Sequence, residues 1–290
     1  MATQRSTFRE VQEGVAWQKA LRDRYLAEGT PPVEHLDLGR AVVRRVSRAF
    51  AEHIILKYEW LGTMAPTSVH YGIFFGDACA GVTCVGVNGV GTAGALKHKE
   101  FGIERSEFCT LARGACVHWA PTGTNSKLVA WTIRLLGKET KSKTLIAYAD
   151  TDAGEIGTIY QACNWVYLGR TMRRPELVSP HGRALNIKLL GDLAKQNHVP
   201  FAEMRKALEA KGWKLQPSNT KHKYIAILDK KDRALVERIE GMRLPYPKRG
   251  DETRGESKDG VAPGHQPGEG GSIPTSPLQD LPKTTRRKRR

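Results

Sequence analysis

Five polar residues of this sequence have the chemical types that acid-base chemistry needs. They are His70, Tyr71, Arg113, Asp150 and Tyr160. The surrounding pattern places each of them on a predicted strand, at a strand end or on a predicted short helix, which brings polar groups together beside a sheet. A carboxylate there accepts a proton, a phenol donates one, and a guanidinium holds an anion. We therefore predict that the chemistry of the protein centres on these five residues.

Four of these residues also have a purely structural interpretation. Asp150 is of a type that commonly forms turns. Tyr160 has the size and the helical position of a core residue. His70 and Tyr71 fit equally well as surface residues of a strand. The residue types by themselves leave both interpretations open.

A polar loop, residues 121–126, reads Pro-Thr-Gly-Thr-Asn-Ser and precedes a predicted helix. The first amide N–H groups of a helix lack intrahelical partners and the helix dipole is positive there, so an anion such as a pyrophosphate binds well. The alternative is that Asn125 and Ser126 only cap the helix. The residues that we predict to bind such an anionic cofactor are Thr122, Gly123, Thr124, Asn125, Ser126 and Lys127.

The elements that must position these residues form a strand-loop-helix-strand-helix-strand series over residues 107–169. The continuous apolar run 144–149 is typical of a strand that is covered on both faces. Leu128, Trp131 and Leu135 recur at helical spacing and predict a buried helix. Residues 36–62 also carry apolar residues at helical intervals and predict one helix. Two hairpin-like strands are predicted at 69–76 and 80–88.

The composition excludes several protein classes. The chain has 290 residues, 40% of them apolar, and no apolar run near the length of a membrane span. It begins without the apolar core of a secretory signal, so we expect a cytoplasmic location, in the host cell if a phage encodes it. Five cysteines without metal-ligand spacing predict reduced core thiols. Phosphate-loop, zinc-protease and serine-hydrolase motifs are all missing.

The charge balance favours a polyanionic partner. Lysine and arginine number 46 against 30 acidic residues, which gives a formal net charge of +16, and the sequence pI is about 9.8. The cations recur in groups, at 221–223, 230–233, 248–249 and 286–290. Clustered cations bind phosphates with little further requirement, and they also solubilise a surface.

The composition along the chain predicts four regions. Residues 1–37 are an N-terminal leader helix and linker, 38–195 an α/β (α+β) catalytic domain with a mixed central sheet, and 196–249 a small basic C-terminal appendix. Residues 250–290 have hardly any large apolar residue, so we expect a disordered basic tail that contacts DNA phosphates without reading bases.

The strand-loop-helix series resembles the GNAT superfamily of N-acetyltransferases. In that acyltransferase fold a loop wraps the pyrophosphate of acetyl-CoA, and a later helix often presents a tyrosine near the thioester. The loop of this chain, PTGTNS, departs from the usual glycine-rich pattern of the superfamily.

Several short motifs resemble a narrower family, the Mom family of phage DNA-modification proteins. They are EWLG at 59–62, HYG at 70–72, LAR at 111–113, NS at 125–126, AYAD at 147–150, IYQACNWVYLG at 159–169, KHKYIAIL at 221–228 and YPKR at 246–249. The likeness covers about residues 38–249. It implies conversion of adenine in double-stranded DNA to N6-carbamoylmethyladenine, which protects phage genomes from restriction, with an acetyl-CoA-like donor.

The resemblance also implies roles for the site residues. Asp150 would orient or deprotonate the adenine amino group, Arg113 would hold an anionic cofactor or a DNA phosphate, and Tyr160 would donate a proton near the thioester. A redox metal is conceivable, with His70, Tyr71 and Asp150 as ligands, but this set is a weak signature and the metal stays unassigned. The rival functions are an ordinary GNAT N-acetyltransferase for a protein or small-molecule amine and a non-catalytic DNA-binding accessory protein.

Overall fold

The computed structural model describes residues 19–21, 23–24, 36–87, 97–173, 175–180 and 184–249. These residues divide into two compact units, a large one that ends at Thr171 and resumes over Thr220–Arg249, and a small one over Met172–Asn219. Most of the predicted leader helix and the whole of the predicted tail beyond residue 250 lie outside the described residues.

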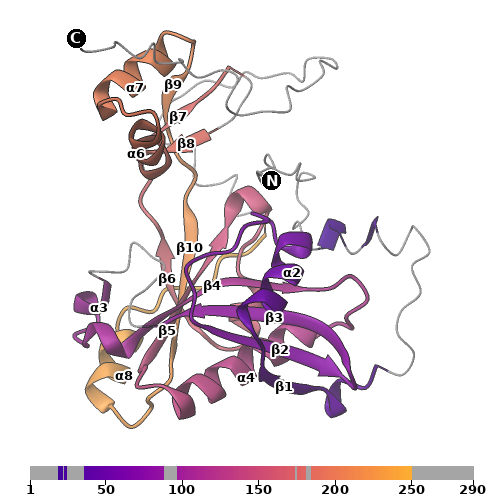
Figure 1. Ribbon diagram of the computed structural model, residues 1–290. Coiled ribbons are helices and arrows are strands. Elements are labelled where there is room, and N and C mark those ends of the chain that lie inside the picture. The colour runs from indigo at the N-terminus through magenta and orange to yellow at the C-terminus, as the bar shows by residue number, and fades with distance from the viewer. Residues whose placement is uncertain are drawn as a thin grey trace, which may run out of the picture. The chain divides into compact units, whose positions relative to one another are not determined.

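The large unit is built on a seven-stranded mixed sheet with the strand order β1-β2-β3-β4-β5-β10-β6 (Figure 1). Its strands are β1 (Val42–Arg45), β2 (Val69–Phe75), β3 (Ala78–Gly86), β4 (Phe108–Cys116), β5 (Thr144–Asp150), β6 (Val166–Arg170) and β10 (Lys221–Ile227). Its helices are η1 (Leu38–Arg40), α2 (Arg48–Tyr58), α3 (Lys97–Glu100), η3 (Arg105–Glu107), α4 (Thr124–Glu139), η4 (Thr151–Ala153), α5 (Thr158–Ala162) and α8 (Arg233–Glu240). The predicted α/β class with a mixed central sheet is confirmed.

Strands β4 and β5 are parallel neighbours that separate part-way along their length. Their paired residues run from Phe108 with Thr144 to Leu111 with Ala147, and no pair follows among the described residues. The rest of β4, Ala112 onward, pairs only with β3. Parallel strands need a crossover connection, and α4 supplies it here. The separation leaves an opening in the sheet beside the start of α4.

Strand β10 is covered on both faces, although it comes late in the chain. It is antiparallel to both β5 and β6 and lies between them. Tyr224 and Ala226 belong to the core cluster that includes α4, whereas Ile225 belongs to the cluster that includes Leu235 and Ile239 of α8. Successive strand residues point to opposite faces, so an apolar strand can serve two cores at once.

The small unit has its own sheet and core. Its elements are β7 (Pro175–Val178), β8 (Ala184–Asn186), α6 (Ile187–Gln196), α7 (Phe201–Glu209) and β9 (Lys214–Pro217), with the strand order β8-β7-β9. Its core residues are Leu177, Leu190, Ala194, Met204, Leu208 and Trp213.

Two predictions about organisation differ from this structure. The predicted boundary at 195/196 does not coincide with the division into units, because β10 completes the central sheet and Thr220–Arg249 therefore belong with the large unit. The single helix predicted over residues 36–62 is wrong. Val42–Arg45 pair with β2 as an edge strand, and Ser47 caps α2 by accepting a hydrogen bond from the amide of Phe50 at 3.2 Å.

All five cysteines are free, as the sequence predicts. Within the described part of the chain, helices with the length and apolar character of a bilayer span are absent.

Candidate functional site

A pocket of about 270 Å³ lies in the opening between β4 and β5. Its wall combines Ala112, Arg113 and Gly114 of β4 with Tyr148 and Asp150 of β5. Further lining comes from other residues of β4, the segment after α2, β3, α4, the loop that leads into α5, α5 itself, the first residue of β10 and Arg249. These residues are Glu59, Trp60, Leu61, Thr83, Thr110, Leu111, Asn125, Val129, Gly154, Glu155, Ile156, Gly157, Thr158, Ile159, Tyr160, Lys221 and Arg249.

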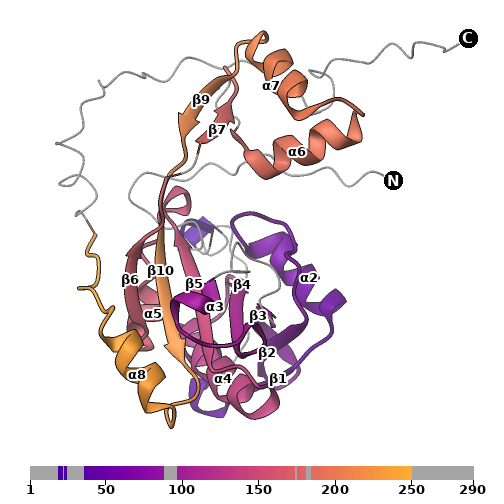
Figure 2. The same cartoon turned by 90° about the vertical axis from the view of Figure 1, so that its left-hand side faces the viewer.

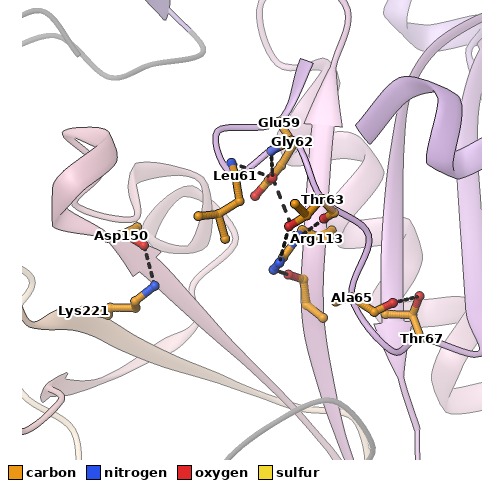
Figure 3. Close-up of polar contacts among 10 residues, drawn as sticks. Glu59, Leu61, Gly62, Thr63, Ala65, Thr67, Arg113, Asp150 and Lys221 are labelled. Carbon is orange, nitrogen blue, oxygen red and sulfur yellow. Dashed lines mark hydrogen bonds and ion pairs between the residues drawn. The ribbon is translucent and has the colours of Figure 1, made fainter. Parts of the chain in front are cut away.

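Asp150 lies at the end of β5, where the sequence predicts it, and it is held from two sides. Its Oδ2 forms an ion pair with the ammonium of Lys221, the first residue of β10 (Figure 3). Its Oδ1 accepts a hydrogen bond from the amide of Asp152 at 3.1 Å and so caps η4. The structural and the functional interpretations of Asp150 therefore coexist, and the carboxylate is fixed in orientation at the pocket.

Arg113 is anchored at the opposite side of the pocket (Figure 3). Its Nε donates to the carbonyl oxygen of Thr63 at 2.7 Å, and one terminal nitrogen donates to its neighbour Ala112 at 2.7 Å. The Glu59 carboxylate lies 3.8 Å from Nε and accepts hydrogen bonds from the amides of Leu61 and Gly62. A guanidinium has five N–H donors, so Arg113 keeps donors for an anionic ligand.

Glu155 is the carboxyl group of the pocket whose proton affinity is most altered. Burial, together with the nearby carboxylates of Asp150 and Glu59, raises its pKa to about 7. A hydrogen bond to the backbone of Asp150 and the positive charge of Lys221 act in the opposite direction on this pKa. A carboxyl group of this kind exchanges its proton near neutral pH, which is what a general acid or base requires.

Tyr160 lies on α5 beside Glu155 at the pocket wall. Its ring packs against Trp165 and Tyr224, with centroid distances of 4.9 Å and 5.2 Å. Burial and the charge of Glu155 raise its pKa well above the usual value for a phenol. Tyr160 is therefore both a packing residue and a permanently protonated hydroxyl at the pocket.

The start of α4 offers two amide groups to the opening. The helix is capped by Gly123, whose φ of 90° is in the left-handed region that favours glycine. The amides of Thr124 and Lys127 bond to Pro121 and Gly123, whereas those of Asn125 and Ser126 have no acceptor in the part of the chain that the structure describes. Asn125 and Ser126 are thus first-turn residues, and the cap interpretation of their side chains is wrong.

The other members of the predicted cofactor loop lie differently. Thr124 is buried and its hydroxyl donates to the carbonyl of Pro121 at 2.7 Å. The sequence predicts that the ammonium of Lys127 binds a phosphate. In the structure it donates hydrogen bonds to the carbonyl oxygens of Leu38 and Gly39 instead. Of the six predicted loop residues, Asn125 lines the pocket.

His70 and Tyr71 do not line the pocket with the other three predicted catalytic residues. Both are buried on β2. The Nε2 of His70 hydrogen-bonds to the hydroxyl of Thr67 at 2.9 Å, and the Tyr71 hydroxyl donates to Glu139 at the end of α4 at 2.9 Å. Burial and nearby arginines lower the pKa of His70. The structure therefore does not bring these two residues together with the other three, because strand pairing turns their side chains to other neighbours.

The described residues contain no group of three or more His, Cys, Asp or Glu side chains that could hold a metal ion. The three conceivable ligands His70, Tyr71 and Asp150 each have a different partner, namely Thr67, Glu139 and Lys221. They do not converge, so the residues present do not fit the metal set that the sequence suggested.

Four pocket residues were missed as site residues by reasoning from the sequence. They are Glu59, Glu155, Lys221 and Arg249. Glu59, Lys221 and Arg249 belong to the motifs EWLG, KHKYIAIL and YPKR, so these motifs could have indicated them as site residues. Glu155 follows η4, the short helix that Asp150 caps, outside the quoted motifs.

The C-terminal residues of the large unit secure the wall behind Tyr160. The Tyr246 hydroxyl donates to the carbonyl of Trp165 at 2.7 Å, and the amide of Leu244 bonds to Tyr167 at 2.9 Å. Trp165 and Tyr167 are buried. These bonds explain why two distant motifs, IYQACNWVYLG and YPKR, occur together in the resemblance.

The model of the Mom protein family matches residues 40–248, which covers both units and every pocket residue except Arg249. The chain belongs to the Mom protein family. No match was found among curated proteins.

Solved structures similar to this Mom-family chain include several acetyltransferases. An N-acetyltransferase from Staphylococcus aureus has 7% identity and a TM-score of 0.37, and the match covers 65% of this chain and 97% of that one. A ribosomal-protein alanine N-acetyltransferase from Escherichia coli has 11% identity and a TM-score of 0.34, with 65% and 94% covered. An aminoglycoside acetyltransferase in complex with coenzyme A and kanamycin has 12% identity and a TM-score of 0.35, with 52% and 98% covered.

Proposed function

We propose that this protein modifies the amino group of adenine in double-stranded DNA, giving N6-carbamoylmethyladenine, with an acetyl-CoA-like thioester as the carbon donor. The observation that carries the proposal is the pocket where β4 and β5 separate, which joins free amides of α4 to a proton-exchanging carboxyl group and a phenol. Membership of the Mom protein family supports the choice of substrate.

The residues present fit an anionic, thioester-bearing cofactor. The amides of Asn125 and Ser126 lack acceptors in the described residues and stand at the positive end of a 16-residue helix, where phosphates bind well. Arg113 lies at the same pocket with unused donors. We infer that these groups hold the cofactor phosphates, while the pocket receives the thioester end. When bound, the cofactor supplies the two-carbon unit.

The acid-base roles follow from the pKa of each group and from the contacts that hold its side chain in place. Burial raises the pKa of Glu155 to about 7, so it is the better base for removing a proton from the amino group. Asp150 is held by Lys221 and by the amide of Asp152, which suits it to orient that amino group. Tyr160 keeps its proton and donates a hydrogen bond to the reacting carbonyl oxygen.

The overall reaction needs a nitrogen donor and a two-electron acceptor in addition to the thioester. Adenine, acetyl-CoA and one ammonia equivalent give the carbamoylmethyl product, free thiol, two protons and two electrons. The new C–N bond forms at the former methyl carbon, so a two-electron acceptor must act, and the amide nitrogen replaces the thiolate. The base is paired inside a duplex, so it must also leave the stack before it reaches the pocket.

Mass spectrometry of nucleosides tests this function. DNA from cells that express the wild-type protein is expected to contain a heavier deoxyadenosine, and Asp150→Ala and Tyr160→Phe, each shown to be folded by circular dichroism, are expected to reduce it strongly. Acetylated amines with unchanged DNA would instead support an ordinary N-acetyltransferase. Unchanged DNA and amines would support the accessory DNA-binding protein. Full modification by either variant would remove its proposed role.

A second test addresses the cofactor by itself. Asn125→Pro removes one of the two free amides at the second helical position, where proline is tolerated. Calorimetry with coenzyme A is expected to show binding that is weaker by about tenfold, because a hydrogen bond to a charged group is worth roughly 1.5–3 kcal/mol. Asn125→Ala, which keeps the amide, serves as the control. Equal affinity in the wild type and Asn125→Pro would contradict the assignment.

A further inference from the structure

None of the described residues of the small unit lines the pocket, yet the unit is a folded module with a core of its own. It is inserted in the chain between β6 and β10, two neighbouring strands of the central sheet. Two neighbouring antiparallel strands need only a short connection, since most connections in compact domains have a few residues.

Two helices of the module, α6 and α7, are joined by a tight turn over residues 197–200. The amide of Val199 bonds to Ala194 at 3.1 Å and that of His198 bonds to Lys195 at 3.1 Å, and His198 has a φ of 55°. These two bonds around a left-handed residue make a Schellman motif, which ends one helix and redirects the chain at once. The next helix begins at Phe201.

The two helices pack against each other and are joined by a short turn, which is the connectivity of a helix-turn-helix. Ala194, a small buried residue on α6, belongs to the same core cluster as Met204 and Leu208 on α7. A small residue at this point lets the second helix lie close across the first. Figure 2 shows α6 and α7 within the small unit. Met204 and Leu208 of α7 are buried, whereas Ala202 and Lys206 on its opposite face and Phe201 at its start are exposed.

The exposed surface around α7 is basic. Residues 195–214 carry Lys195, Arg205, Lys206, Lys211 and Lys214 against Glu203 and Glu209. Arg205 pairs with Glu209 at 2.7 Å. The four lysines are exposed and have no ion-pair partner within the described residues. Such a surface is complementary to a polyanion.

Strand β9 follows α7 and extends this surface. It is at the edge of its sheet, antiparallel to β7, and all four of its residues are exposed, with Leu215 50% exposed. A helix-turn-helix followed by an exposed edge strand can place the helix in a groove and the strand along the backbone.

We propose that residues 172–219 are a helix-turn-helix module that binds double-stranded DNA, with α7 in the major groove and β9 against the phosphates. The major groove of B-form DNA, about 12 Å wide, admits a helix, whereas the deep and narrow major groove of duplex RNA does not. The choice of DNA as the partner rests on the proposed function. The module supplies the duplex binding that a pocket of about 270 Å³ cannot provide for a whole helix.

The test measures binding of a labelled DNA duplex by fluorescence anisotropy at several salt concentrations. The variant is the full chain with Lys206→Ala, Lys211→Ala and Lys214→Ala. The matched control replaces Lys99, Lys138 and Lys141, three exposed lysines of the large unit outside the basic groups, by alanine. Each lost phosphate contact reduces the magnitude of the slope of log K against log salt by about 0.9, so the loss of three contacts is expected to reduce it by about 2.7 and to weaken binding at least about tenfold near 0.1 M salt.

Two further measurements make the outcome decisive. Calorimetry is expected to give the same affinity for coenzyme A in the module variant and the wild type, which would show that the large unit is intact. If the triple variant does not fold, the single substitution Lys206→Gln takes its place. Three results would each contradict the proposal that the module binds DNA. They are unchanged DNA binding by the variant, an equal loss of affinity in the control, and equal competition by duplex RNA. Absent coenzyme A binding in the wild type would count against the proposed function and would leave the DNA result standing.

Discussion

Replacing Glu155 by glutamine is expected to lower the rate of adenine modification by at least about 100-fold, the usual contribution of a positioned general base. The amide keeps the size of the side chain and its place at the pocket, but it cannot accept the proton of the amino group. Nucleoside analysis over time measures the rate. Glu237→Gln, an exposed carboxylate on α8, is the control and is expected to be as active as the wild type.

The pH dependence gives the same prediction a second readout. Since burial and neighbouring carboxylates raise the pKa of Glu155 to about 7, the wild-type rate is expected to rise as the pH passes through about 7 and the base loses its proton. The residual rate of Glu155→Gln is expected to lack this step. A variant that retains both the rate and the step would show that Glu155 is not the base.

Glu155→Gln is expected to be less active than the wild type but, at high pH, more stable against unfolding. Between the ordinary carboxyl pKa and about 7 the folded state binds more protons at Glu155 than the unfolded state, so stability falls as the pH rises through this window. A glutamine side chain does not ionise, so Glu155→Gln does not lose stability over this pH range. Glu155→Gln is therefore expected to be more stable than the wild type at pH 8, by on the order of 2 kcal/mol, and to differ little at pH 4. Thermal melts at both pH values measure this.

The second large effect is expected on stability, from Gly157→Ala at the N-terminus of α5. Gly157 has a φ of 77°, and a Cβ atom there would stand 2.3 Å from a ring carbon of Tyr224. The left-handed backbone costs an alanine about 1–2 kcal/mol, and the contact forces the buried ring to move, at about 1–3 kcal/mol. We expect a loss of about 3 kcal/mol in the free energy of unfolding.

The matched control is Gly137→Ala on α4. A Cβ atom there meets nothing closer than 3.8 Å, and the residue lies inside a helix, so alanine is expected to stabilise the protein by about 0.5–1 kcal/mol. Denaturant titration of both variants measures the difference. Because Tyr224 supports the ring of Tyr160, Gly157→Ala is also expected to reduce activity. Equal stability of the two variants would contradict the clash.

Local features of this protein could be predicted from the sequence because they depend on neighbouring residues. The apolar run before Asp150 specified a covered strand with the carboxylate at its end, and the polar loop before Leu128 specified the start of a buried helix. The motifs also indicated the family, since several of them supply pocket residues.

Contacts between distant segments were decided only by the tertiary structure. Strand β10 comes after the small unit in the chain, yet it enters the sheet between β5 and β6, and this brings Lys221 to Asp150. No local pattern specifies such pairing, because a strand with two apolar faces fits any covered position in a sheet. His70 has the right chemistry for a reactive group, but the direction of its side chain depends on strand register, which the sequence alone does not determine. The raised pKa of Glu155 likewise depends on burial and on Glu59, which is far away in the chain, so only the folded protein shows it.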